Sequence, residues 1–258
     1  MNRAAGNFLF LFVLALALLF SPVPQAAFGD AAEAAEAPAV LAWVNRLRAQ
    51  RGLSKLGTDP LLEKTAAAYV VDLAERGILS HVDKQGRRAL QRFRAYGGTT
   101  VLVGEILGSA ATLRPVTAAW QASAEHLEVV LNPLWTHCGA ATAQRAGSNP
   151  VWVVLFTRHR IDPLEILRCP EGYLIRGRLT DLRALEPILL SGIETIDPLH
   201  WDSRKGEFSF LVPPDRGQIY HRLGYRSRDG GLVVANTFYP LEALTSEVVT
   251  SDREKESR

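Results

Sequence analysis

The stretch GILSHVDKQG (residues 77–86) joins two segments that have the apolar spacing of helices, and it places a serine, a histidine and an aspartate at their junction. Upstream, TDPLLEKTAAAYVVDLAERG offers Asp59 as N-cap, Pro60 at the first helical position and Gly77 as terminator. Downstream, RRALQRFRAYGG predicts a shorter basic helix. Such a polar junction is either a capped, solvated turn or one piece of a site whose other pieces lie further along the chain.

The surrounding residues 38–160 predict the order helix, helix, helix, strand, helix, strand, strand, after an Ala/Glu-rich lead-in at residues 30–37. VLAWVNRLRAQRGL is the first helix, TTVLVGEILG a buried strand, and RPVTAAWQASAEHLEVVLN one long helix. HCGAATAQ and VWVVLFTRHR then read as two strands around the turn RAGSNP. Strands flanked by long amphipathic helices predict helices packed on the faces of an antiparallel sheet.

The C-terminal part has a different character, with short apolar runs between glycines and prolines. GYLIRGRL, PILLSGI, EFSFLVP, QIYHRLGY and LVVANTFYP predict five strands. We therefore expect a small all-β, sandwich-like domain over residues 171–243. A linker at residues 161–170 precedes it, and a polar tail at residues 244–258 follows it.

The N-terminus has the layout of a secretory signal peptide over residues 1–29. An uninterrupted apolar run, Phe8–Phe20, precedes helix breakers and small residues, and cleavage is expected between Ala26 and Gly29. A membrane span needs about 20 apolar residues, so an uncleaved anchor is the alternative. The pattern predicts a secreted or periplasmic protein.

The net charge and the cysteine content limit the classes of partner and the covalent bonds that the protein can have. A formal net charge of +2 gives no electrostatic reason to expect nucleic acid. Cys138 and Cys169 are the only two cysteines, and in an oxidising compartment they can form one disulfide. We predict that bond, with two separate thiols as the alternative.

Three residues of the first domain could carry chemistry. Glu105 interrupts an otherwise apolar strand, where a buried charge is costly unless it is paired. His81 follows the second helix and His126 lies in the fourth. Two imidazoles and a carboxylate could hold a divalent metal, zinc or calcium, if the fold assembles them. We predict that His81 and His126 both approach Glu105, directly or through a water or metal. The alternative is that the histidines are scattered.

Four short motifs occur in the order of the bacterial branch of the cysteine-rich secretory protein, antigen 5 and pathogenesis-related superfamily, whose SCP-like domain residues 38–160 resemble. They are N-x-x-R in the first helix, S-H-x-D-x-x-G, G-E in the first strand, and W-x-x-S-x-x-H. The matching residues are Asn45 and Arg48; Ser80, His81, Asp83 and Gly86; Gly104 and Glu105; and Trp120, Ser123 and His126.

This resemblance implies an α+β fold, an α-β-α sandwich with a shallow cleft lined by two histidines and acidic residues. His81, Glu105 and His126 match three of its four cleft positions. Ser123 stands where animal and plant members have the fourth, a glutamate, and Ser80 is placed at the edge of the same cleft. Asp83 and Gly86 are expected to shape the turn after His81.

We expect a non-enzymatic extracellular binding protein whose cleft holds a metal, a lipid or a glycan. The alternatives are a metal-assisted, peptidase-like extracellular hydrolase using the same residues, and a structural cell-envelope protein. A serine hydrolase would need a nucleophile beside its base, and no G-x-S-x-G turn exists in the sequence. The expected partner is a lipid, a glycan or an envelope protein, with membrane contact only through an uncleaved N-terminus.

Overall fold

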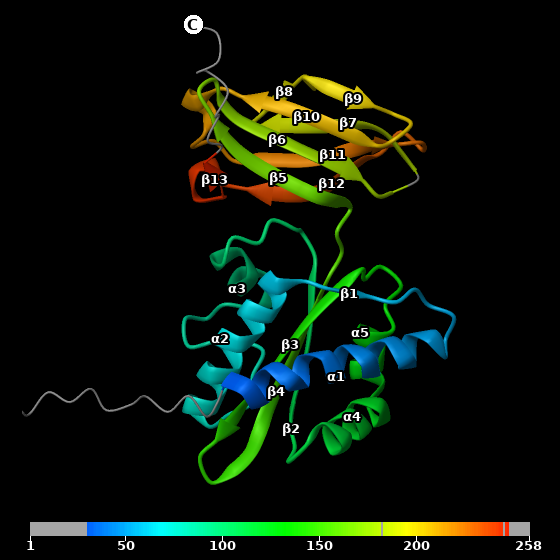
Figure 1. Ribbon diagram of the computed structural model, residues 1–258, viewed down its shortest axis with the longest axis vertical. Helices are drawn as coiled ribbons and strands as arrows, with labels where there is room; N and C mark the ends of the chain where they lie inside the picture. Colours follow the sequence, from blue (N-terminus) through cyan, green and yellow to red (C-terminus); the bar gives the residue numbers. More distant parts are fainter. Residues whose placement is uncertain (1–29, 182, 245, 248–258) are drawn as a thin grey trace, which may run out of the picture.

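The computed structural model describes residues 30–181, 183–244 and 246–247, so the predicted signal peptide and the end of the predicted tail lie outside the described residues. The described chain forms a domain of helices around a sheet, with a sandwich of strands stacked on one end of it (Figure 1). Within this part of the chain no helix is both long enough and apolar enough to cross a bilayer.

The sheet of the first domain has the strand order β1-β3-β4-β2. Its strands are β1 (Gly57–Thr58), β2 (Val103–Ser109), β3 (His137–Arg145) and β4 (Ser148–Thr157). The three long strands are antiparallel, as predicted, and the short β1 adds in parallel to β3. Two residues are too few to show an alternating pattern, so the sequence did not predict β1.

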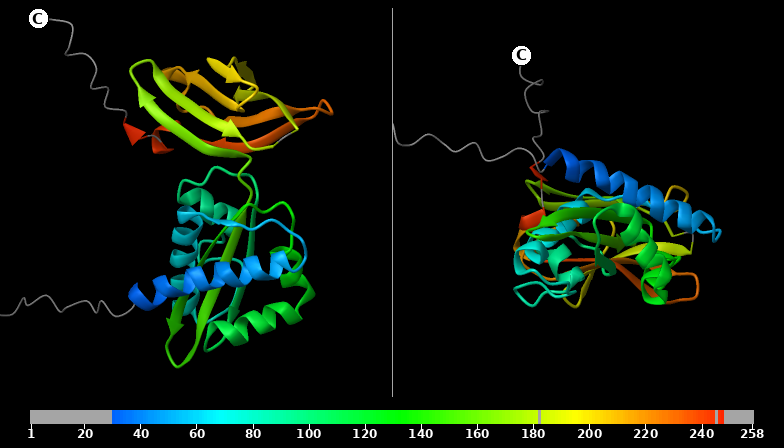
Figure 2. Two further views of the ribbon diagram at one scale, coloured as in Figure 1. Left: turned by 45° about the vertical axis from the view of Figure 1, so that its right-hand side comes forward. Right: turned by 90° about the horizontal axis from the view of Figure 1, so that it is seen from below.

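Helices cover both faces of this sheet, which confirms the α-β-α sandwich. α1 (Asp30–Ala49), α4 (Leu113–Ala122) and α5 (Ala124–Val130) pack on one face, and α2 (Pro60–Arg76) and α3 (Ala89–Ala95) on the other (Figures 1 and 2). Alternate residues of β4 point into the two cores, because successive strand side chains face opposite ways. Trp152, Val154 and Phe156 enter the α1 side, and Val151, Val153 and Leu155 enter the α2 side.

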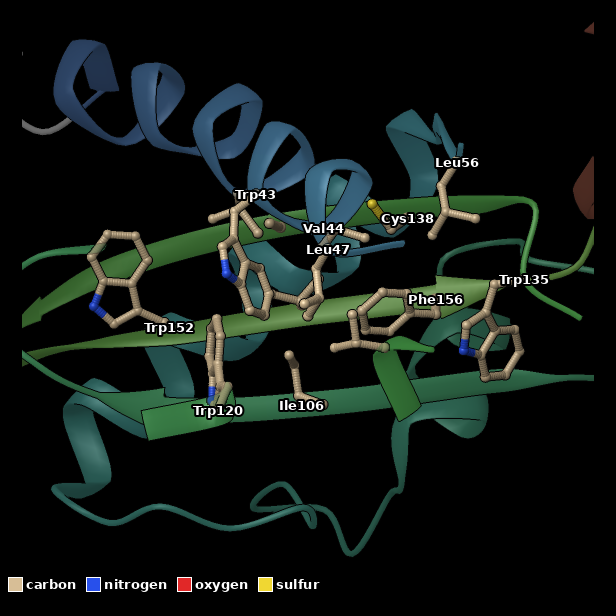
Figure 3. Close-up of a cluster of buried hydrophobic side chains, with 14 of the residues drawn as sticks. Trp43, Val44, Leu47, Leu56, Ile106, Trp120, Trp135, Cys138, Trp152 and Phe156 are labelled. Atoms are coloured by element: carbon tan, nitrogen blue, oxygen red, sulfur yellow. The ribbon is translucent and has the colours of Figure 1, made fainter. Parts of the chain in front are cut away.

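The core on the α1 side is built around large aromatic side chains (Figure 3). The rings of Trp43 and Trp120 lie 5.6 Å apart between α1 and α4. Cys138 packs in the same cluster and is 2% exposed, and this burial raises the pKa of its thiol to about 12.

The predicted disulfide is wrong, because both cysteines are free thiols. Cys138 is enclosed in the first-domain core, whereas Cys169 ends a strand of the sandwich and its Sγ lies 3.5 Å from the carbonyl of Gly172. The sequence showed that the two could pair, but not that the fold places them in separate domains.

The predicted fourth helix is broken in two at Ser123. That residue is extended (φ −102°, ψ 121°), ends α4 and is the N-cap of α5, with its hydroxyl accepting from the backbone N–H of His126 at 3.4 Å. Serine is a strong N-cap because its hydroxyl satisfies a free amide of the first turn. The apolar spacing runs through the break, which is why it predicted one helix.

The second domain is a β-sandwich, as predicted. A five-stranded sheet of order β13-β5-β6-β10-β9 packs on a four-stranded sheet of order β12-β11-β7-β8. The elements are β5 (Ile161–Cys169), β6 (Gly172–Leu179), β7 (Ala184–Ser191), β8 (Glu194–Ile196), β9 (His200–Asp202), β10 (Glu207–Val212), η1 (Pro214–Arg216), β11 (His221–Ser227), β12 (Leu232–Phe238), η2 (Leu241–Leu244) and β13 (Ser246–Glu247).

Two predicted boundaries of this domain are wrong. The expected linker at residues 161–170 is strand β5, which pairs antiparallel with β6 and buries Ile161 and Ile166 in the sandwich core. The start of the expected polar tail contains β13, which pairs parallel with β5. One proline, Pro163, and three charged residues interrupt the apolar residues of this segment, so its sequence did not show the pattern of a strand.

The two domains are joined by hydrogen bonds at the end of the first domain that carries α3. The backbone N–H of Thr237 donates to the carbonyl of Thr99 at 2.7 Å, and Asn236 Nδ2 donates to the Thr99 hydroxyl at 2.9 Å. Arg94 Nη2 donates to the Thr237 hydroxyl at 3.0 Å. Strand β12 of the sandwich is therefore held directly against the segment that follows α3.

Candidate functional site

The loop that carries His81 is held by three side chains of the neighbouring helices. The carbonyl groups of residues 80–82 are each an acceptor. The first accepts from the hydroxyl of Tyr69, the second from Arg92 Nη1 at 3.2 Å, and the third from Arg76 Nη1 at 3.0 Å. Because every carbonyl in a row has a partner from α2 or α3, the backbone of this loop is positioned before any ligand arrives.

The turn after His81 is organised by Asp83, as predicted. Its Oδ1 accepts from the backbone N–H groups of Gln85 at 2.9 Å and Arg87 at 2.8 Å, and its Oδ2 accepts from Arg87 Nε at 2.8 Å. Burial alone would raise the pKa of the Asp83 carboxyl, but these hydrogen bonds outweigh burial and lower it. Gly86 completes the turn with φ +77°.

Glu105 finds two partners on the α2 side of the sheet. Its side chain is 4% exposed, and its neighbours two residues away, Val103 and Leu107, pack into the core on the α2 side. Its Oε1 lies 2.7 Å from Nδ1 of His81, and its Oε2 pairs with Nη2 of Arg92. The predicted contact with His81 is confirmed, and Arg92 is the charge partner that the buried carboxylate needs.

Arg92 is the functional residue that sequence reasoning missed. Its side chain is 3% exposed and its guanidinium lies 3.4 Å from the centre of the Tyr69 ring. Burial, before any charge effect, raises the pKa of Tyr69 to about 12, so its hydroxyl stays a donor. The available signal was the position of Arg92 beside buried Phe93 and three residues after buried Ala89, which is unusual for an unpaired arginine.

His126 does not join this group. Its helix, α5, buries Val130 in the core on the α1 side, so His126 belongs to the opposite helix layer from Glu105. Its Nδ1 is buried without a hydrogen-bond partner. Among the hydrogen bonds of the described residues, none joins its ring to Glu105. The predicted approach of both histidines to Glu105 therefore holds only for His81.

The three predicted metal ligands do not fit zinc or calcium as they are arranged. Across the described ranges, no group of three or more His, Cys, Asp or Glu side chains is placed to hold a metal ion. Both oxygens of Glu105 already face protein cations or imidazole, and His126 lies in the other layer. A zinc ligand must offer a free lone pair at about 2.0–2.2 Å, which Glu105 cannot do while Arg92 holds it.

The two predicted cleft serines shape the backbone. The Ser80 hydroxyl donates to the carbonyl of Val82 at 3.1 Å and accepts from its N–H at 3.0 Å. The Ser123 hydroxyl caps α5, as described above. Neither hydroxyl is held by a general base, so neither is set up as a nucleophile.

His81 is the residue of this site that can contact a ligand, because its side chain is 54% exposed. The short contact with the Glu105 carboxylate orients the ring and favours a proton on Nδ1. The other ring nitrogen, Nε2, is then free to accept a hydrogen bond when the ring is neutral or to donate one when it is protonated. The site therefore offers an oriented imidazole backed by a buried carboxylate and guanidinium.

The fold and this loop define a bacterial type of secretory-protein domain, and comparison with known proteins agrees. Residues 41–156 match the Cysteine-rich secretory protein family (CAP). An uncharacterized protein of Borreliella burgdorferi is 30% identical over 117 residues, which are 45% of this chain and 75% of that protein. The uncharacterized protein YkwD of Bacillus subtilis is 27% identical over 118 residues, 45% of each chain.

Solved structures with similar folds include an outer surface protein from Borrelia burgdorferi (29% identity, TM-score 0.44, covering 47% of this chain and 90% of that one). An extracellular protein containing a SCP domain from Bacillus anthracis is also similar (18% identity, TM-score 0.45, covering 49% of this chain and 41% of that one). The chain belongs to the Cysteine-rich secretory protein (CAP) family.

Proposed function

We propose that this protein is exported and acts as a non-enzymatic binding protein at the bacterial envelope, with His81 as its recognition residue. The observation that carries the proposal is an exposed imidazole on a loop whose backbone is fixed by α2 and α3. Preorganising a polar group lowers the entropic cost of binding. Export is supported by the apolar run at residues 8–20 and by membership of a family of secretory proteins.

The charge around His81 favours an anionic ligand over a cation. Arg92 neutralises Glu105 inside the protein, so the buried carboxylate does not offer its charge to the surface. Lys84 and Arg88 are exposed and near His81 in the sequence. Lys84 lies 4.0 Å from the exposed Glu75, and the partly exposed Arg87 is paired with Asp83, so Arg88 adds the positive charge that no acidic side chain of the described residues pairs with. An envelope glycan or polymer that carries carboxylate or phosphate groups fits this surface.

Binding is favoured over hydrolysis because the site has an oriented imidazole but no attacking group beside it. The hydroxyls of Ser80 and Ser123, the two candidate nucleophiles, serve the backbone. The metal that would activate water has no ligand set among the described residues.

The test is co-sedimentation of the purified protein with bacterial sacculi that carry their anionic polymer and with sacculi from which it has been stripped. The wild-type protein should bind the first and lose most binding to the second. His81→Ala should reduce binding to the intact sacculi, whereas His200→Ala, which removes an exposed histidine of β9, should not. Equal binding by the two variants, or no binding by the wild type, would rule out the proposal.

The same co-sedimentation experiment distinguishes binding from hydrolysis. If soluble glycan or peptide fragments accumulate with the wild type and not with His81→Ala, the site is catalytic and the proposed binding-only function is wrong. Fragment levels that are equal with both proteins support binding.

A further inference from the structure

A second concentration of charge lies where the first domain passes into the sandwich. Asp181, whose side chain is 8% exposed, is surrounded by the guanidinium groups of Arg158, Arg160 and Arg183. The nearest nitrogens of these groups lie 3.6, 3.4 and 3.2 Å, respectively, from Oδ2 of Asp181. The hydroxyl of Tyr225 donates to the same oxygen. One carboxylate thus faces three cations.

These donors exceed what the carboxylate can accept. A carboxylate oxygen has two lone pairs, and Oδ2 of Asp181 is approached by four donor groups. Arg183 also reaches Oδ1, through its backbone N–H at 3.0 Å and its Nε at 3.3 Å. Arg158, at 3.6 Å, is outside hydrogen-bond distance, and its side chain makes no hydrogen bond to the described residues. Its donors are therefore available to a ligand.

The positive charge at this cluster is also in excess. Three guanidinium groups against one carboxylate leave a surplus of two. Arg158 and Arg160 are only 18% and 20% exposed, so water screens their mutual repulsion incompletely. Burial lowers the pKa of the Arg158 guanidinium, and the nearby positive charge of Arg160 lowers that pKa further. Asp229 acts on Arg183 from outside the cluster and keeps its negative charge, so it offsets part of this surplus at Arg183 but does not figure among the charges that act on Arg158.

The connecting segment holds this arrangement in place. His159, between the two arginines, points to the first domain, where its Nε2 lies 2.8 Å from Asp59 Oδ2 and its backbone N–H donates to the Thr136 hydroxyl at 2.8 Å. Arg158 and Arg160, on either side of His159, both direct their guanidinium groups toward Asp181, at 3.6 and 3.4 Å from its Oδ2. The backbone between the two arginines is therefore anchored to the first domain by His159.

We propose that Arg158, Arg160 and Arg183 form an anion site for a phosphate group at the junction of the two domains. A phosphate monoester carries about −1.5 to −2 charges at neutral pH, which is opposite in sign to the surplus at this cluster. Guanidinium groups bind phosphate oxygens in a bidentate fork, and three such groups around one point suit a tetrahedral oxyanion. This site is separate from His81 and does not depend on the function proposed for it.

The test is the melting temperature of the full chain titrated with inorganic phosphate, at an ionic strength kept constant with sodium chloride. A ligand that binds the folded state raises the melting temperature in a saturating way. Arg183→Gln removes the most exposed of the three cations, at 67%, so the variant should fold normally. It should raise the phosphate concentration for half of the shift by about tenfold or more, the loss expected for one charge-assisted hydrogen bond.

Two further variants make the result decisive. Arg226→Gln removes an arginine of the same sandwich that is 51% exposed and paired with Glu186, and it should respond to phosphate like the wild type. Asp181→Asn removes the competing carboxylate and should tighten phosphate binding relative to its own phosphate-free baseline. Equal responses of Arg183→Gln and Arg226→Gln, or a shift that chloride reproduces, would overturn the site.

A second arm separates the sources of the phosphate group. Replacing inorganic phosphate by a soluble glycerol phosphate polymer tests phosphodiesters of envelope polymers. An Arg183-dependent shift with the polymer assigns the site to such a polymer, and one with inorganic phosphate alone assigns it to free phosphate or a terminal monoester. An Arg183-independent response to both contradicts the proposal, whatever the effect of His81→Ala on sacculus binding.

Discussion

Glu105 and Asp181 are both nearly buried carboxylates, and they differ in how many cations meet them. Glu105 has one guanidinium, Arg92, and one imidazole, His81, so its charge is balanced inside the CAP domain. Asp181 has three guanidinium groups and a tyrosine hydroxyl, so positive charge is left over at the domain junction. The balanced cluster fixes a loop, whereas the unbalanced one has charge to offer a ligand.

The largest effect should come from breaking the balanced pair. Arg92→Met leaves Glu105 buried with only an imidazole beside it, and removing one partner of a buried pair costs about 3–5 kcal/mol. We expect a loss of this size in the free energy of unfolding, measured in urea. The matched control is Arg176→Met, since that arginine is 54% exposed and pairs with Glu165, which is 44% exposed; its loss should stay below about 1 kcal/mol. Equal losses in the two variants would mean that Glu105 does not need Arg92.

Asp181→Asn should have the next largest effect. It removes charge-assisted hydrogen bonds worth about 1.5–3 kcal/mol at neutral pH. Burial would raise the pKa of the Asp181 carboxyl, but the hydrogen bonds from Arg183 and Tyr225 outweigh it and hold the pKa well below its usual range. A depressed pKa stabilises the fold above the unfolded value, about 3.9, and this contribution is lost as pH falls below that value.

The acid limb of stability against pH should therefore be flatter in Asp181→Asn than in the wild type. Glu186→Gln, at an exposed pair with Arg226, is the control and should leave that limb unchanged. An acid limb that stays as steep in Asp181→Asn would show that the arginines do not hold this carboxylate.

The two tyrosines provide a smaller and paired comparison. The hydroxyl of Tyr69 donates to a neutral carbonyl, that of Ser80, whereas the hydroxyl of Tyr225 donates to the charged Asp181. Tyr69→Phe should cost about 0.5–1 kcal/mol and Tyr225→Phe, which removes one of the several hydrogen bonds to Asp181, about 1.5 kcal/mol, because hydrogen bonds to charged groups contribute more. Thermal and urea unfolding of both variants measure the two losses in the free energy of unfolding. A larger loss in Tyr69→Phe than in Tyr225→Phe would contradict a charged Asp181 at the domain junction.

The smallest expected effect is a pH dependence at His137, a residue of β3 whose ring packs against that of His159. Burial and then the charge of His159 lower the pKa of His137, with Asp162 and Asp59 opposing them. The ring is thus favoured neutral in the fold, and this stabilisation is complete above the unfolded pKa, about 6.5, and is lost as pH falls from there. His137→Gln should remove that part of the pH dependence of the free energy of unfolding, while His200→Gln should not. Identical curves of stability against pH for the two variants would mean that a group other than His137 titrates.

Local patterns predicted most of the elements. The N-cap Asp59, the terminator Gly77 and the apolar stripes located the helices, and the short apolar runs located the long strands of the sandwich other than β5. The patterns failed where a single residue overrides the period, as Ser123 does in breaking the fourth helix. They also failed at β5, because charged residues and Pro163 interrupt the apolar residues that bury it.

The sequence by itself determined that Glu105 needs a partner, because a carboxylate within an apolar strand cannot stay buried alone. It also determined, through the order of four motifs, the CAP family and the place of His81. Only the tertiary structure decided that the partner is Arg92, that His126 lies in the other helix layer, and that Cys138 and Cys169 stay apart. These depend on which helix covers which face of the sheet, and that choice is made by packing across the whole domain, which no local spacing records.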